Sequence, residues 1–138
     1  MRCRFLLLPI LLCALSPLSG TELARPTVAK FLKLLLQSMG GKPVACNDKE
    51  LAGELAALGV PMSPEAKCVW MDADKDLPRL LKEGRMVICG SRPALAAGAA
   101  MALVAEEGRP AIYVNPKALA SSGVSLPDHI LKIAKVAQ

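Results

Sequence analysis

The stretch KCVWMDADKDLPRLLKEGRMVICGS, residues 67–91, places two short apolar segments on either side of a charged segment. The apolar segments, residues 67–71 and 85–89, are apolar at almost every position, which is typical of strands buried on both faces of a sheet. Between them, leucines recur at helical spacing before Gly84, which favours a helix end: Leu77, Leu80 and Leu81. A strand, a helix and a second strand in this order predict parallel strands joined by a crossover helix.

The same alternation extends toward the N-terminus. An amphipathic helix is predicted over residues 28–39, because apolar side chains recur at helical spacing: Val28, Phe31, Leu32, Leu35, Leu36 and Met39. A short apolar strand at residues 43–46 follows, and then a second helix over residues 49–58, for which Asn47 or Asp48 can serve as the N-cap.

The C-terminal third has a different pattern. Residues 100–105 and 111–114 are apolar and are joined by a short polar link with a glycine, which predicts an antiparallel hairpin. A short helix after Asn115 and a last helix follow, and we expect the buried side of the last helix to be formed by Ile130, Ile133 and Ala134. We therefore predict an α/β fold, a single three-layer domain over residues 24–138, with a mixed, largely parallel sheet and helices on both faces, and with a C-terminal β-hairpin and helix.

Residues 1–20, MRCRFLLLPILLCALSPLSG, have the order of a secretory signal peptide. Arg2 and Arg4 form a basic start, residues 5–15 are apolar without interruption, and residues 16–20 are small and turn-prone. The apolar run is shorter than the roughly 20 residues that a membrane span requires. We expect cleavage near Gly20 and export of the protein, the alternative being an ordinary buried helix.

Composition excludes several classes of protein. Of the 138 residues, 53% are hydrophobic and 21% are charged, which does not fit a disordered chain. The net charge is +5; loss of the two arginines in residues 1–20 leaves 15 basic and 12 acidic residues, or +3. The basic residues are scattered along helical faces and only 3% of residues are aromatic, so we predict no nucleic-acid binding.

Few residues fit a catalytic or metal-binding role. His129 is the only histidine, and its neighbour Asp128 points in a different direction on a helix, so we expect a surface histidine. Asp72, Asp74 and Asp76 have the spacing of calcium ligands, but the central glycine of a calcium loop is missing, and helix capping explains these residues better. We predict no enzyme, no cofactor and no metal site.

Polar and small residues follow the predicted strands. In open parallel sheets, small molecules bind beyond the carboxyl ends of the strands. The residues expected at that rim are Asn47, Asp48, Asp72, Gly90 and Ser91. Helix capping would also explain them without a ligand. Trp70, which precedes this rim, is expected in the core, where its indole N–H requires a hydrogen-bond partner.

Five segments together resemble the YfiR-like periplasmic proteins. They are the strand CVWM at residues 68–71, GAAMALVAEEGR at residues 98–109, IYVN at residues 112–115, ALASSGVSL at residues 118–126, and ILKIAKV at residues 130–136. The resemblance implies an exported, periplasmic regulator that binds the external sensing domain of an inner-membrane diguanylate cyclase. Such a regulator holds the cyclase inactive and so lowers cyclic-di-GMP and biofilm formation.

Three cysteines remain beyond the N-terminal segment: Cys46, Cys68 and Cys89. The residues alone allow either one disulfide with one buried thiol, or three reduced core cysteines. The resemblance implies a disulfide between Cys46 and Cys68, which match the family's paired strand cysteines, and no counterpart is found for Cys89.

The interpretation we favour is therefore a regulatory binding protein. Phe31 and Leu35, on the apolar side of the first helix, could supply part of a partner surface, although core packing is the simpler explanation for both. A homodimer is also compatible with the sequence. The alternative function is a small periplasmic solute-binding module that uses the rim at the strand ends.

Overall fold

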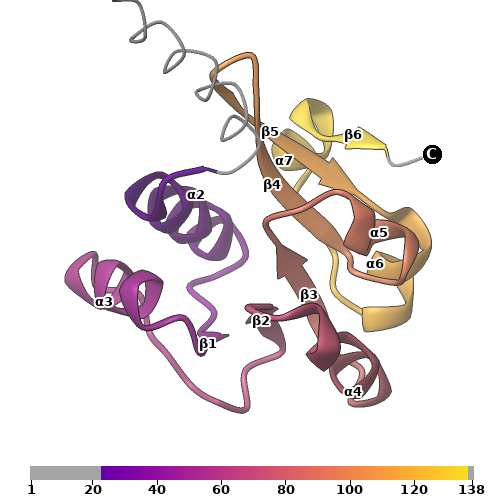
Figure 1. Cartoon of the computed structure of the whole chain (residues 1–138), viewed down its shortest axis with the longest axis horizontal. Helices are drawn as coiled ribbons and strands as arrows, with labels where there is room; N and C mark the ends of the chain where they lie inside the picture. Colours follow the sequence, from indigo (N-terminus) through magenta and orange to yellow (C-terminus); the bar gives the residue numbers. More distant parts are fainter. Residues whose placement is uncertain (1–22, 137–138) are drawn as a thin grey trace, which may run out of the picture.

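The computed structural model describes residues 23–136, which fold around one six-stranded sheet. The strands lie side by side in chain order, as Figure 1 shows: β1 Val44–Cys46, β2 Cys68–Trp70, β3 Met86–Cys89, β4 Met101–Glu106, β5 Arg109–Val114 and β6 Lys135–Val136. The first four strands run parallel, β5 is antiparallel to β4, and β6 is parallel to β5. The predicted mixed, largely parallel sheet and the hairpin are confirmed.

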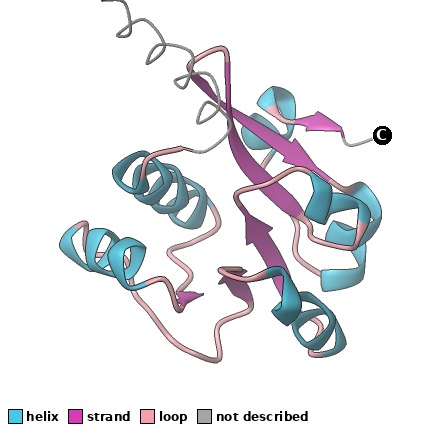
Figure 2. Ribbon diagram, in the orientation of Figure 1, coloured by secondary structure: helices cyan, strands magenta, loops and turns pink. Residues whose placement is uncertain are grey.

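Helices cover both faces of this sheet (Figure 2). One face carries four helices: α2 Arg25–Ser38, α3 Lys49–Ala57, α6 Pro116–Ser122 and α7 Asp128–Ile133. The other face carries two short helices: α4 Leu77–Lys82, which a single 3-10 turn over Asp74–Asp76 precedes, and α5 Pro93–Ala96. The domain therefore has the three layers that the sequence predicted.

Strand β3 shows how the alternation of side chains builds both cores. Met86 and Ile88 pack among the side chains of α2 and α3, whereas Val87 and Cys89 pack among those of α4 and α5. All four residues are almost completely buried. A strand that is apolar at every position is what a sheet covered on both faces requires.

The Asp48 cap that the sequence allowed is formed, whereas the caps expected before α4 and α5 are not. The Asp48 side chain caps α3, and Asn115 caps α6 by accepting hydrogen bonds from the N–H groups of Lys117 and Ala118. By contrast, the N-cap position of α4 is Asp76 and that of α5 is Arg92, and neither helix start has a side-chain cap. The prediction that capping accounts for Asp72, Asp74 and Ser91 was therefore wrong.

The chain end also differs from the prediction. Helix α7 ends at Ile133, and the following residues adopt the extended conformation of β6, which pairs with β5. Ile130 is buried as expected, but Ile133 is 61% exposed. Ile133 was assigned to the buried side because it lies three residues after Ile130; in a helix of six residues that spacing does not guarantee burial.

The predicted disulfide between Cys46 and Cys68 is not formed, and all three described cysteines are free thiols. The register of the parallel strands explains this result: Cys46 lies opposite Trp70, and Cys68 lies opposite Val44. An offset of two residues along neighbouring strands separates the two Cα atoms by about 8 Å. A disulfide requires a separation below about 7 Å.

The predicted signal peptide, residues 1–20, lies outside the described residues. Among the helices of residues 23–136, none has the length and apolar character needed to cross a bilayer.

Candidate functional site

A pocket of about 280 Å³ lies at the carboxyl ends of β2 and β3, beside the start of α2; we call it the rim pocket. Four of the five residues predicted for a ligand rim line it, namely Asp48, Asp72, Gly90 and Ser91. Asn47 instead lines a neighbouring hollow of about 140 Å³ that shares Trp70 and Asp72 with the rim pocket. The parallel topology therefore gathers most of the predicted rim at one place.

One wall of the rim pocket is an ion pair between α2 and the start of α3. Arg25 Nη2 lies 2.7 Å from Asp48 Oδ2, and Arg25 Nε donates a hydrogen bond of 2.9 Å to the same oxygen. Asp48 Oδ1 accepts a hydrogen bond of 3.0 Å from the backbone N–H of Leu51. The hydrogen bond from this N–H is the main reason why the pKa of Asp48 lies below its usual range, and the Arg25 guanidinium lowers it further. Asp48 is therefore ionised at neutral pH, and the positive charge of Arg25 balances its negative charge.

Trp70 lines the rim pocket from β2. The residue is only 8% exposed, and a Cβ added at Gly90 would lie 3.5 Å from its ring atoms Cζ2 and Cη2. The indole N–H makes no hydrogen bond with any residue between 23 and 136, so the partner that the sequence led us to expect is not found there. Buried N–H groups without a partner are rare in native proteins.

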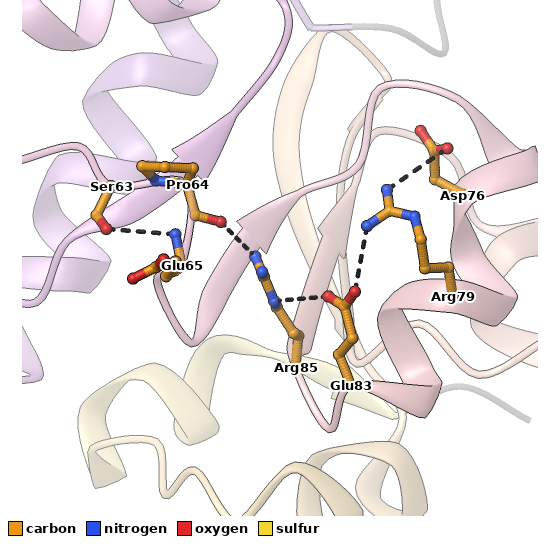
Figure 3. Close-up of polar contacts among 7 residues, drawn as sticks. All are labelled: Ser63, Pro64, Glu65, Asp76, Arg79, Glu83 and Arg85. Atoms are coloured by element: carbon orange, nitrogen blue, oxygen red, sulfur yellow. Dashed lines mark hydrogen bonds and ion pairs between the residues drawn. The ribbon is translucent and has the colours of Figure 1, made fainter.

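The three aspartates after β2 have different surroundings. Asp76 lies 3.6 Å from Arg79, which also lies 3.4 Å from Glu83 (Figure 3). The chain of contacts continues through Arg85, which pairs with Glu83 at 3.0 Å and donates a hydrogen bond of 2.9 Å to the carbonyl of Pro64.

The other two aspartates do not join this network. Asp72 and Asp74 are exposed, line the rim pocket, and make no side-chain hydrogen bond or ion pair with any residue of the described chain. Their carboxylates therefore leave the pocket mouth with two negative charges that no described cation pairs directly.

A second feature is an apolar groove of about 490 Å³ between α2 and α7, over β4 and β5; we call it the α2–α7 groove. Both residues predicted for a partner surface, Phe31 and Leu35, line this groove. Leu35 is buried and Phe31 is half-buried, and both pack against the core beneath α2. The two residues therefore serve the core and also form part of the groove wall.

Two further apolar side chains project at the edges of the α2–α7 groove. Leu34 is 62% exposed on α2, and Ile133 is 61% exposed on α7. These are the two most exposed large apolar residues of the described chain. On a small domain, exposed apolar side chains that line one groove are typical of an interaction site.

The sequence matches no protein-family model, and it matches no curated protein. Solved structures do resemble the fold. A conserved domain protein from Vibrio cholerae O1 biovar El Tor is 11% identical, with a TM-score of 0.62, over 83% of this chain and 60% of that chain. A domain from Streptococcus pneumoniae, described as the ABC domain in complex with L-Trp, is 10% identical, with a TM-score of 0.56, over 75% of this chain and 59% of that chain. At these identities the likeness concerns the fold alone, and this chain spans about 60% of the length of either protein.

A polar cluster surrounds Tyr113 beside β6, on the face of the sheet that carries α4 and α5. Glu106 accepts hydrogen bonds from the Tyr113 hydroxyl and, at 2.8 Å, from Lys135 Nζ. The guanidinium of Arg92 lies 4.1 Å from the centre of the Tyr113 ring. The hydrogen bond from Lys135 is the main reason why the pKa of Glu106 is lowered, and the hydrogen bond from Tyr113 lowers it further. This cluster attaches β6 to the hairpin.

The residues considered for chemistry are not brought together. His129 lines the α2–α7 groove but makes no hydrogen bond or ion pair with Asp128. Within residues 23–136, no group of three or more histidine, cysteine, aspartate or glutamate side chains could hold a metal ion. Burial raises the pKa of the Cys46, Cys68 and Cys89 thiols, which therefore stay protonated at neutral pH.

Sequence reasoning missed Leu34 and Ile133. A signal for Leu34 was present, because it lies next to Lys33 on the polar side of an amphipathic helix, where an apolar residue has no packing role. No comparable signal marked Ile133, since its exposure depends on where α7 ends.

Proposed function

We propose that this protein is an exported regulator of the YfiR type. In the periplasm it binds the external sensing domain of an inner-membrane diguanylate cyclase and holds the cyclase inactive, which lowers cyclic-di-GMP and biofilm formation. The resemblance of residues 98–136 to the YfiR-like proteins supports this proposal. The observation that carries it is the α2–α7 groove with its two exposed side chains, Leu34 and Ile133.

The groove has the composition of a protein-binding site. Its centre is apolar, and Gln37, Ser38 and His129 add polar groups to its lining. Protein interfaces commonly combine a dry apolar centre with a polar rim. We infer that the cyclase domain inserts apolar side chains between Leu34 and Ile133 and meets the polar side chains of the groove at its periphery.

A binder changes the activity of its partner only by preferring one of the partner's states. Burial of a Leu or Ile side chain is worth about 1.5–3 kcal/mol when the side chain starts fully exposed. Leu34 and Ile133 start about three-fifths exposed, so contact with the inactive state alone would favour that state by about 2–4 kcal/mol. This preference equals a shift of roughly 30- to 1,000-fold in the cyclase equilibrium.

Isothermal titration calorimetry with the purified external domain of the cyclase tests this function. We expect the wild-type protein to bind, and the double variant Leu34→Glu with Ile133→Glu to lose at least tenfold in affinity. Leu131→Glu is the matched control, because Leu131 is 44% exposed on the same helix as Ile133 but does not line the groove. Absence of binding by the wild type, or equal binding by the double variant, would contradict the proposal.

The proposed location requires removal of the N-terminal segment. We expect the mature protein to begin near Thr21. N-terminal sequencing of the protein from a periplasmic extract would check this, and recovery of intact Met1 would contradict export by a cleaved signal.

A further inference from the structure

We propose that the rim pocket binds a small organic ammonium compound that also carries an oxygen acceptor, such as an amino alcohol. The ammonium group faces the carboxylates of Asp72 and Asp74, and the oxygen accepts a hydrogen bond from the indole N–H of Trp70. This site is separate from the α2–α7 groove and does not depend on the regulatory function proposed above.

The first observation behind this inference is the unpartnered donor on Trp70. The residue is more than nine-tenths buried and lines the rim pocket, and its N–H has no partner among residues 23–136. A buried donor left unpaired costs about 1–3 kcal/mol. The ring carbon Cζ2, adjacent to the carbon that bears Nε1, faces Gly90 at the pocket wall. A bound acceptor in the pocket would satisfy this donor.

The second observation is the charge at the pocket mouth. Arg25 forms an ion pair with Asp48, and Arg79 forms one with Asp76. Of the aspartates around the strand ends, Asp72 and Asp74 are therefore the two that no described cation pairs. Neither of them caps α4, so capping does not account for their place. Burial is the main reason why the pKa values of Cys46 and Cys89 are raised, and the charges of Asp72 and Asp74, respectively, raise them further, so the field of both carboxylates reaches the strand ends. A cation is therefore the complementary ligand charge.

The size and walls of the pocket narrow the ligand class. The volume of about 280 Å³ lies just below the range that holds drug-sized molecules. Apolar side chains of Leu23, Val28 and Leu103 line part of the wall, which suits the carbon atoms of an organic cation. A bare metal ion fits less well, because no described group of three acidic, histidine or cysteine side chains could hold one.

Gly90 keeps the space beside Trp70 open. A Cβ at this position would make an ordinary contact of 3.5 Å with the indole ring, and the Gly90 backbone does not have a positive φ. Gly90→Ala should therefore fold normally while it narrows the pocket. This substitution offers a steric test that leaves every charge in place.

The single tryptophan provides a direct readout. The chain has one Trp, so the indole N–H of Trp70 gives one isolated peak in a ¹⁵N–¹H correlation spectrum. Titration with ethanolamine at constant ionic strength should move this peak in a saturable way. Propylamine, which lacks the oxygen, and ethylene glycol, which lacks the charge, should each bind at least tenfold more weakly, and calcium chloride should leave the peak in place.

Three variants complete the test. Asp72→Asn with Asp74→Asn should weaken ethanolamine binding at least tenfold, and Gly90→Ala should weaken it severalfold. Glu65→Gln with Glu107→Gln removes the same charge from exposed positions outside the rim pocket and should leave the affinity unchanged. The proposal is overturned if ethanolamine does not move the peak in the wild type, if calcium moves it instead, or if the Asp72 and Asp74 variant binds as tightly as the Glu65 and Glu107 control.

Discussion

Asp48 Oδ2 lies 2.7 Å from Nη2 of Arg25, so the side chain that caps α3 also holds the first turn of α2. The two helices pack side by side on the same face of the sheet (Figure 1). Asp48 is 8% exposed, and its carboxylate is satisfied by charge-assisted hydrogen bonds from the Leu51 N–H and the Arg25 guanidinium, which are stronger than neutral ones.

Replacement of Asp48 separates these two roles. Asp48→Ala removes both the cap and the ion pair, and we expect the free energy of unfolding to fall by about 1–3 kcal/mol. Asp48→Asn keeps a capping oxygen and loses only the charge, so its cost should be clearly smaller. Urea unfolding followed by circular dichroism measures both values, and equal losses for the two variants would show that the cap contributes nothing.

The same residue predicts how stability depends on acid. The pKa of Asp48 is lowered in the folded protein, so its charged form stabilises the fold. This stabilisation is fully present above the ordinary carboxyl pKa of about 3.9 and is lost as the pH falls through the lowered value. Asp48→Asn should therefore destabilise the protein at pH 6 and converge with the wild type near pH 2. If the free energies of unfolding of Asp48→Asn and the wild type differed by the same amount at pH 6 and pH 2, the charge of Asp48 would not be the source of the effect.

The Glu106 cluster should control the attachment of β6. Glu106→Gln removes the charge that Lys135 contacts, so we expect faster amide hydrogen exchange at residues 135 and 136 with little change in β3. The pKa of Glu106 is lowered and that of Lys135 is raised, chiefly by their mutual hydrogen bond. The stabilisation of β6 by the Glu106–Lys135 pair is therefore lost as the pH falls through the lowered Glu106 pKa, and also as the pH rises through the raised Lys135 pKa. Protection factors at residues 135 and 136, which correct for the intrinsic pH dependence of amide exchange, should fall at pH 2; equal protection factors at pH 2 and pH 7 would contradict this role.

The cysteines should behave as three separate thiols. Mass mapping without reductant should find Cys46, Cys68 and Cys89 unpaired, and dithiothreitol should leave the melting temperature unchanged. Half-buried Cys46 should react first with iodoacetamide, because the other two are almost completely buried and all three have raised pKa values. A Cys46–Cys68 peptide would show that the strand register of the structure is wrong.

Among the glycines of residues 23–136, Gly98 is the one where an added Cβ meets the closest contact. Its φ is +121°, and an added Cβ would lie 2.5 Å from Cδ1 of Leu81. Leu81 is partly exposed and can move aside, so the backbone strain should dominate the cost of Gly98→Ala, at about 1–3 kcal/mol. Leu81→Ala in the same chain should therefore rescue little, and full rescue would show that the clash matters more than the strain.

The sequence predicts the fold well because the relevant signals are local. Apolar segments such as residues 85–89 specify strands buried on both faces, and Asp48 and Asn115 mark helix starts by their own side-chain chemistry. The order of such segments determines the parallel sheet, and that order also brings four of the five predicted rim residues to one pocket.

The features that sequence reasoning missed depend on strand register and on the exact boundaries of short elements. The offset between Cys46 and Cys68 is a property of strand register, which the separate strands do not reveal. The exposure of Ile133 depends on where α7 ends and β6 begins. The lack of a cap role for Asp72 and Asp74 depends on the 3-10 turn over Asp74–Asp76, after which α4 begins at Leu77.

The level of cyclic-di-GMP in cells tests the regulatory function most directly. We predict that deletion of the protein raises cyclic-di-GMP, and that the wild type and Leu131→Glu, expressed at equal levels, both restore the low value. The double variant Leu34→Glu with Ile133→Glu should fail to restore it, although it is folded and exported. Unchanged cyclic-di-GMP after deletion, or full restoration by the double variant, would contradict the account.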